Sequence, residues 1–135
     1  MNCTIYTDGG SLNNPGQAAY AFVIYFDNKL EYQFSETIGV ATNNIAEYTG
    51  LIKALEKIKE YKKSKTIDKI FVYADSELMV KQLNGLYKVK NADLRDCVMK
   101  VRYLESEINI PVQYSHVLRE KNTLADSLVK KALGR

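Results

Sequence analysis

Four acidic residues stand where a strand is predicted to end or a helix to begin. Asp8 and Asp75 each follow a short predicted strand, whereas Glu47 and Asp126 lie near the start of runs with helical spacing. Strand ends and helix starts share one edge of an α/β layer, so we expect the four carboxylates to meet there. Clustered like charges repel and need a cation, and an all-carboxylate site favours the hard cations Mg²⁺ or Mn²⁺. Two such ions about 4 Å apart suit a phosphoryl displacement, so the pattern by itself favours a magnesium-dependent nuclease.

Each acid also has an ordinary structural interpretation. Asp8 before Gly9 is compatible with a turn, and Asp75 with a cap on the helix that follows it. Residues 44–47 (Asn-Ile-Ala-Glu) and 123–126 (Thr-Leu-Ala-Asp) resemble capping boxes, in which the acid bonds the backbone at the helix start. These interpretations hold better for one acid than for four together, because clustered carboxylates repel.

The elements that must position the acids follow from the spacing of apolar residues. The first 40 residues predict strands: an alternating segment around 3–7, a run at 18–26, and a returning segment at 30–38 after a turn at 27–29. Residues 9–16 are rich in turn formers, so we expect Asp8 to end the first strand. Helical spacing predicts helices over about 45–58, 76–84, 92–107 and 123–133, with further strands at 69–74 and 111–116.

The predicted order is β-β-β-α-β-α-α-β-α, which is typical of an α/β fold. Opening hairpins followed by αβ units predict a mixed five-stranded sheet with helices on both faces. A length of 135 residues predicts one domain, residues 1–135. In such sheets the ligand crevice lies at the carboxyl ends of the parallel strands, where the four acids are predicted.

The composition is that of an ordinary globular protein, with 46% hydrophobic and 26% charged residues. Nineteen Lys and Arg against 16 Asp and Glu give a net charge of +3, which permits an anionic partner without requiring one. The longest mainly apolar run, residues 18–26, is too short to span a membrane, and the start lacks signal-peptide features. We therefore expect a cytoplasmic protein. Cys3 and Cys97 are expected to be reduced thiols, with a bridge between them as the alternative.

Four segments resemble the motifs of the type 1 ribonuclease H family, in the order in which the family has them. The first is residues 6–11 (Tyr-Thr-Asp-Gly-Gly-Ser) with residues 14–16 (Asn-Pro-Gly), and the second is residues 42–47 (Thr-Asn-Asn-Ile-Ala-Glu). The third is Asp75-Ser76, and the fourth comprises His116, Asn122, Ala125 and Asp126. These motifs span nearly the whole chain, and the predicted order of elements matches the family's fold.

The resemblance implies a ribonuclease H-like fold and an endonuclease that hydrolyses the RNA strand of RNA/DNA hybrids, leaving 3′-hydroxyl and 5′-phosphate ends. It implies that Asp8, Glu47, Asp75 and Asp126 bind two Mg²⁺ or Mn²⁺ ions. Physically, one ion would lower the pKa of the attacking water and the other would stabilise the departing 3′ oxygen.

The resemblance also implies roles for seven other polar residues. His116, ten residues before Asp126, would assist proton transfer or product release; otherwise it is an ordinary polar residue that ends a strand. The implied substrate contacts are Asn14, Asn43 and Asn44 for the RNA strand, Thr42 and Asn91 for a phosphate of the DNA strand, and Ser76 at a helix start that favours phosphate. The same asparagines also suit turns and helix starts.

The sequence departs from the family in ways that widen the range of functions. Only 15 residues separate Asp75 from Asn91, which leaves no room for the basic helical insertion of some members. Residues 87–90 (Tyr-Lys-Val-Lys) are either a small substitute for that insertion or a solvated loop. Val40 stands where some relatives have an Arg beside the phosphate pocket, and nine residues follow Asp126. The alternatives are activity on double-stranded RNA and a silent nucleic-acid-binding module; we expect a monomer without an obligate protein partner.

Overall fold

The computed structural model describes residues 1–135, and its elements occur in the order that the sequence predicts. They are β1 (Asn2–Ser11), β2 (Gly16–Phe26), β3 (Lys29–Ala41), α1 (Asn43–Tyr61), β4 (Lys69–Ala74), α2 (Glu77–Leu83), α3 (Ala92–Ile108), β5 (Val112–His116) and α4 (Thr123–Ala132). One turn of 3-10 helix, η1 (Arg119–Lys121), precedes α4 and was not predicted.

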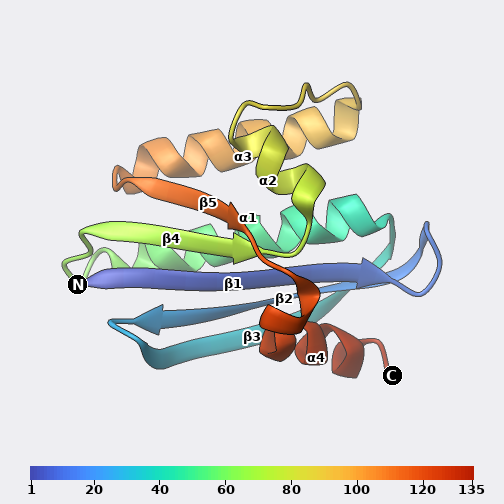
Figure 1. Cartoon of the computed structure of the whole chain (residues 1–135), viewed down its shortest axis with the longest axis horizontal. Helices are drawn as coiled ribbons and strands as arrows, with labels where there is room; N and C mark the ends of the chain where they lie inside the picture. Colours follow the sequence, from blue (N-terminus) through green and yellow to red (C-terminus); the bar gives the residue numbers. More distant parts are fainter.

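The predicted mixed sheet is confirmed, with the strand order β3-β2-β1-β4-β5 (Figure 1). Hairpins join β1, β2 and β3 in antiparallel pairs, whereas β4 lies parallel to β1 and β5 parallel to β4. A parallel pair needs a crossover, which α1 supplies before β4 and which α2 and α3 supply before β5. Since Thr7 of β1 pairs with Ala74 of β4, the residues that follow them, Asp8 and Asp75, lie at the same edge.

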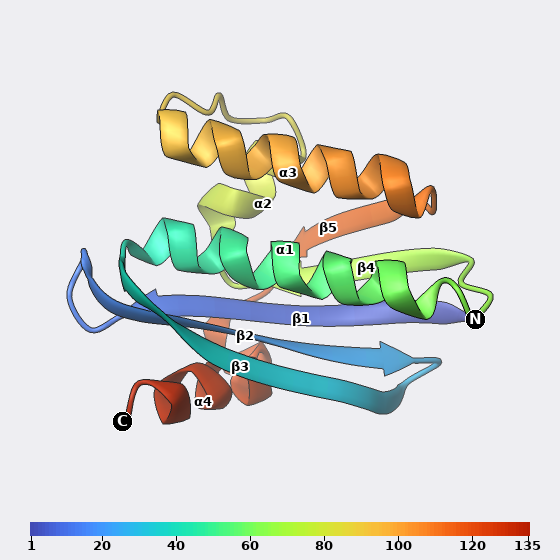
Figure 2. The same ribbon diagram turned by 180° about the vertical axis from the view of Figure 1, so that it is seen from behind.

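Helices cover the two faces of the sheet unequally. Helices α1, α2 and α3 lie on one face (Figure 2), and the other face carries only α4, which packs on β1, β2 and β3 (Figure 1). The largest core side chains between the sheet and α1 include Ile5, Ile24, Leu51, Leu55 and Ile70. On the opposite face, Val129 of α4 packs on Ala19 and Ala21, whose small side chains let the helix approach β2 closely.

The end of β1 differs from the prediction, because Asp8 does not end the strand. Residues 9–11 continue β1 and pair with residues 18–20 of β2. Gly9 is suited to a close contact rather than to a turn: a Cβ on it would lie 2.3 Å from the backbone carbonyl carbon of Ala46 in α1. Turn formation and close backbone approach both favour glycine, so the sequence alone does not distinguish them.

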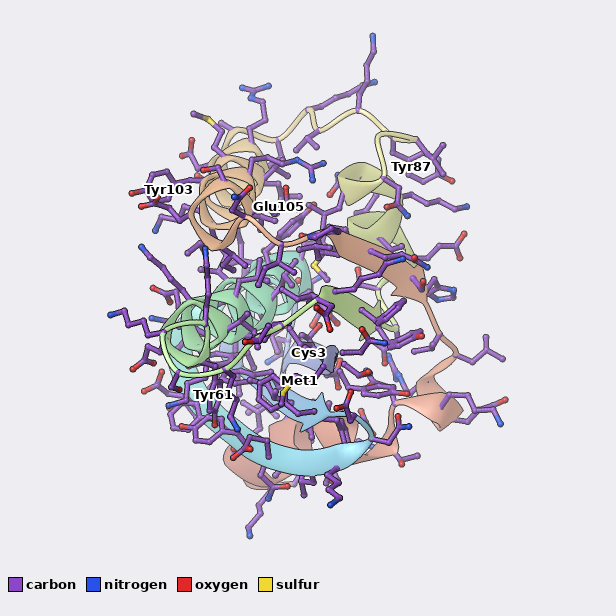
Figure 3. The ribbon with its side chains drawn as sticks, turned by 90° about the vertical axis from the view of Figure 1, so that its left-hand side faces the viewer. Met1, Cys3, Tyr61, Tyr87, Tyr103 and Glu105 are labelled. Carbon is purple, nitrogen blue, oxygen red and sulfur yellow. The ribbon has the colours of Figure 1, made fainter.

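The structure also bears on the membrane and disulfide predictions. None of the helices combines the length and the apolar composition that crossing a membrane requires. Both cysteines are free thiols, as predicted. Cys3 is buried at the start of β1 (Figure 3), and Cys97 is partly buried on α3.

Candidate active site

Three of the four predicted acids lie together at the carboxyl edge of β1 and β4. Asp8, Glu47 and Asp75 each place one carboxylate oxygen within 4.8 Å of the other two. Asp8 is 5% exposed and Glu47 is 8% exposed, and the side chain of Asp75 is 5% exposed. Three carboxylates therefore share a small, largely desolvated space, which is unfavourable without a counter-ion.

Glu47 reaches this space because α1 touches β1 without intervening side chains. A Cβ on Gly9 would lie 2.5 Å from the backbone nitrogen of Glu47, and a Cβ on Gly50 would lie 3.1 Å from the carbonyl oxygen of Asp8. The two glycines, one on each element, remove the atoms that would otherwise separate them. The distance between the Asp8 and Glu47 carboxylates therefore depends on glycine as much as on the acids.

Asp126 lies in the first turn of α4 and faces the same pocket from the other side. This pocket of about 360 Å³ is lined by all four predicted acids, together with Asn43, Asn44 and Ser76. Asp126 does not belong to the group of three within 4.8 Å, and its Oδ2 lies 3.0 Å from Nζ of Lys130. The structure thus brings the four acids to one pocket as a close group of three and a fourth at its wall.

The ordinary structural roles considered for these acids are not the ones they play. Ser76, and not Asp75, caps α2, and Thr42 caps α1 two residues before the predicted capping box, residues 44–47, begins. Helix α4 has no side-chain cap. Asp8 lies inside a strand and not in a turn. Helix capping and turn formation therefore do not explain why four acids occur here.

The carboxylates perturb each other's ionisation. Burial, together with the charge of Asp75, raises the pKa of Asp8 from 3.8 to about 7. Burial and the charge of Asp8 raise the pKa of Glu47 well above its usual value. Oε2 of Glu47 and Oδ2 of Asp75 are buried and lack a hydrogen-bond partner. Carboxylate oxygens that lack hydrogen bonds in a desolvated group fit a hard divalent cation, which would bind them and offset the repulsion.

Basic residues around the pocket were not predicted from the sequence. Nε of Arg119 lies 3.6 Å from Oδ2 of Asp75, and Lys130 and Arg135 also line the pocket. Arg119 belongs to η1, whose three residues show no periodic pattern, so only the path of the chain brings it to Asp75. Lys130 follows Asp126 by four residues in α4, and this helical spacing was a usable signal.

Asn43 joins three parts of the predicted RNA-binding surface. Its Oδ1 accepts hydrogen bonds from the backbone N–H of Ser11 at 2.8 Å and from the Ser11 hydroxyl at 3.0 Å. Its own backbone N–H donates to Oδ1 of Asn14 at 3.0 Å. The end of β1, the β1–β2 loop and the start of α1 are thereby tied together. Asn44, the next residue, is exposed at the pocket.

The other predicted substrate residues begin helices, and the predicted histidine stands apart. Thr42, Ser76 and Asn91 cap α1, α2 and α3 by accepting hydrogen bonds from backbone N–H groups. The starts of α1 and α3 lie at the same end of the helical layer (Figure 2). His116 ends β5, is exposed, and does not line the pocket that holds the acids.

The strand order and the buried carboxylates at the ends of β1 and β4 define a ribonuclease H-like domain with an acidic centre suited to a metal ion. The chain belongs to the RNase H family, because the family model described as RNase H matches residues 1–134. The carboxylate cluster is typical of the metal-dependent members of that family.

Similar proteins cover nearly the whole chain. "Bifunctional protein Rv2228c" of Mycobacterium tuberculosis is 36% identical over 135 residues, which are 98% of this chain and 36% of that protein. "Ribonuclease HI" of Halobacterium salinarum is 38% identical over 129 residues, which are 95% of this chain and 62% of that protein. The chain thus spans less than two thirds of the length of these relatives. The solved structure of LC11-RNase H1 in complex with an RNA/DNA hybrid has a TM-score of 0.93 at 37% identity, covering 98% of this chain and 97% of that chain.

Proposed function

We propose that this chain is an endonuclease of the RNase H family that hydrolyses the RNA strand of RNA/DNA hybrids, leaving 3′-hydroxyl and 5′-phosphate ends. The observation that carries the proposal is the buried group of Asp8, Glu47 and Asp75, whose oxygens lie within 4.8 Å of one another. The similarity to LC11-RNase H1, whose structure holds an RNA/DNA hybrid, supports the choice of substrate. We propose residues 1–135 as one catalytic domain.

Asp8, Glu47, Asp75 and Asp126 would hold two Mg²⁺ or Mn²⁺ ions in this proposal. When bound, such ions supply positive charge beside the scissile phosphate and lower the pKa of water. The four carboxylates line one pocket, which they reach from β1, α1, α4 and the end of β4. Without cations the same acids would repel a phosphate, so their grouping favours a metal-dependent reaction.

The remaining predicted residues would bind substrate or move protons. His116 would transfer a proton or assist product release, and its exposed position at the end of β5 is compatible with a residue that moves. Asn14, Asn43 and Asn44 would contact the RNA strand. Thr42 and Asn91 would contact a phosphate of the DNA strand, and Ser76 would lie beside the acids. The first N–H groups of α1 and α3 add a favourable environment for phosphate.

Cleavage of three labelled substrates tests this function. The full chain is incubated with an RNA/DNA hybrid, an RNA duplex and single-stranded RNA, each with Mg²⁺, with Mn²⁺ and with EDTA. We expect metal-dependent cleavage of the hybrid and loss of cleavage in Asp75→Asn. Asp96→Asn is the matched control, because Asp96 is an exposed acid on α3 outside the pocket.

Each result has a distinct meaning for the proposal. No metal-dependent cleavage of the hybrid would refute the proposed activity, and hybrid binding without cleavage would identify a silent binding module. Preferential cleavage of the RNA duplex would reassign the substrate. Full activity in Asp75→Asn would leave the proposed activity standing but reject the proposed site.

A further inference from the structure

The sheet face that carries α4 has an open part with three tyrosines side by side. Tyr25 of β2, Tyr6 of β1 and Tyr73 of β4 point to this face, and β4 and β5 carry no helix there (Figure 1). The ring centroids of Tyr6 and Tyr73 lie 5.2 Å apart in a stacked arrangement, and those of Tyr6 and Tyr25 lie 6.0 Å apart edge to face. All three side chains are partly exposed. We call these three residues the tyrosine face.

The tyrosine face borders a pocket between the sheet and the start of α4. This pocket of about 320 Å³ is lined by Tyr6 and Tyr25, with Thr4, Asn28 and Thr123 as polar neighbours. It is a different pocket from the one that holds the acids, and none of the four acids lines it. It therefore combines flat aromatic walls with hydroxyl and amide groups, which suits a planar ring with polar edges.

Two lysines that form no ion pair lie beside the tyrosine face. Lys121 is the only charged residue that lines the pocket, and Lys69, at the start of β4, lies 4.9 Å above the ring of Phe71. Neither lysine is in an ion pair. Asn122 donates its side-chain N–H to the carbonyl oxygen of Thr7 at 2.8 Å and does not cap α4. The first N–H groups of α4 therefore add further positive potential beside the pocket.

The tyrosine face adjoins the acidic centre along two strands. Tyr6 precedes Asp8 by two residues, and Tyr73 precedes Asp75 by two residues. Two residues of a strand span about 7 Å, so the Cα atoms of these two tyrosines lie about 7 Å along the chain from those of the two acids. The start of α4 separates the two pockets, since residues 122–125 line one and Asp126 lines the other.

We propose that the tyrosine face is a second nucleic-acid site, which binds unpaired nucleotides of a single strand by stacking their bases on Tyr6, Tyr25 and Tyr73. Aromatic side chains on an open sheet stack any unpaired base, because every base has a π-face, whereas a duplex keeps its bases inside. The lysines and the start of α4 complement the phosphates of such a strand. This inference goes beyond the proposed hydrolysis and needs no metal ion.

Binding in EDTA separates this site from the proposed catalysis. Fluorescence anisotropy measures the Kd for short labelled oligo(U) and oligo(dT), and for an abasic oligomer of equal length and charge. The test variant is Tyr25→Leu/Tyr73→Leu, which keeps apolar volume and removes the rings, and Tyr25→Phe/Tyr73→Phe restores them. Tyr103→Leu is the matched control, because Tyr103 is 61% exposed on the outer side of α3 (Figure 3).

We expect the leucine pair to weaken binding of oligo(U) and oligo(dT) at least about fivefold, since each stacked base contributes strongly to affinity. The Kd values of the phenylalanine pair and of Tyr103→Leu should stay within about twofold of the Kd of the unchanged protein. The unchanged protein should bind the abasic oligomer as weakly as the leucine pair binds oligo(U) and oligo(dT). The ratio of oligo(U) to oligo(dT) affinity tells whether RNA or DNA is preferred.

Three results would overturn the proposal: an unchanged Kd in the leucine pair, equal affinity for the abasic oligomer, or equal weakening by Tyr103→Leu. A dimer in sedimentation that the leucine pair dissociates, without oligomer binding, would assign the face to a second copy of the chain. If the leucine pair does not fold, photocrosslinking of the unchanged protein to bromouridine oligomers decides. Crosslinks at Tyr6, Tyr25 or Tyr73 support the site, and crosslinks only elsewhere reject it.

Discussion

Replacing Gly9 by alanine should move α1 away from β1 and so separate Glu47 from Asp8. The added Cβ would lie 2.3 Å from the carbonyl carbon of Ala46 and 2.5 Å from the backbone nitrogen of Glu47. An ordinary contact needs at least about 3.4 Å, so the helix must shift by about 1 Å, and backbone atoms cannot rotate aside as a flexible side chain can. Overpacking of this kind costs about 1–3 kcal/mol of stability.

The same shift should impair the proposed reaction more than the fold. A misplacement of about 1 Å in a catalytic arrangement can lower the rate about 100-fold. Cleavage of a labelled RNA/DNA hybrid measures the rate, and thermal unfolding by circular dichroism measures stability.

Gly10→Ala is the matched control, because a Cβ there would lie 3.8 Å from Val129 and 3.9 Å from Asn43, which is ordinary contact. If Gly9→Ala is as active and as stable as Gly10→Ala, the reasoning about the α1–β1 contact is wrong.

Three further predictions concern charge, metal and hydrogen bonding. In the metal-free protein, the raised pKa values of Asp8 and Glu47 mean that the folded state keeps protons that the unfolded state releases. The free energy of unfolding should therefore fall as pH rises from about 4 to about 7. In thermal melts in EDTA, the melting temperature of Glu47→Gln should depend less on pH than that of the unchanged protein. An equal pH dependence in both proteins would contradict this. Mg²⁺ should raise the melting temperature of the unchanged protein and have less effect on Asp75→Asn, whereas equal shifts would argue against a metal site at this acid. Asn43→Ala removes both hydrogen bonds from the end of β1 and should cost about 1 kcal/mol in thermal unfolding, whereas Asn44→Ala should cost less; equal losses would rule out this role for Asn43.

The periodicity of the sequence predicted most elements, and the chain path explains what it missed. Strand β4 has the predicted bounds, Lys69–Ala74, because its buried and half-buried residues alternate strictly. Helix α3 begins at Ala92 as predicted, where Asn91 supplies the cap. The end of β1 was predicted wrongly, since a glycine such as Gly9 suits both a turn and a close contact. Segment η1 was missed, because three residues are too short for a periodic signal.

The capping patterns show a similar limit of local reasoning. Residues 44–47 and 123–126 resemble capping boxes, but the cap of α1 is Thr42, two residues before Asn44, and α4 has no side-chain cap. A cap pattern depends on where the helix starts, and the start depends on what the preceding strand or loop contacts. In α1 that contact is the pair of hydrogen bonds that Asn43 accepts from the Ser11 N–H and donates to Asn14.

The sequence by itself identified the candidate residues, because acid type and position relative to predicted strands and helices are local properties. It predicted that Asp8, Glu47, Asp75 and Asp126 meet at one edge of the sheet, and all four line one pocket there. Only the tertiary structure decided that three of them lie within 4.8 Å while Asp126 stays at the wall, and that Arg119 reaches Asp75. The reason is that distances and desolvation arise from contacts between segments far apart in the chain, such as the Gly9 contact with α1.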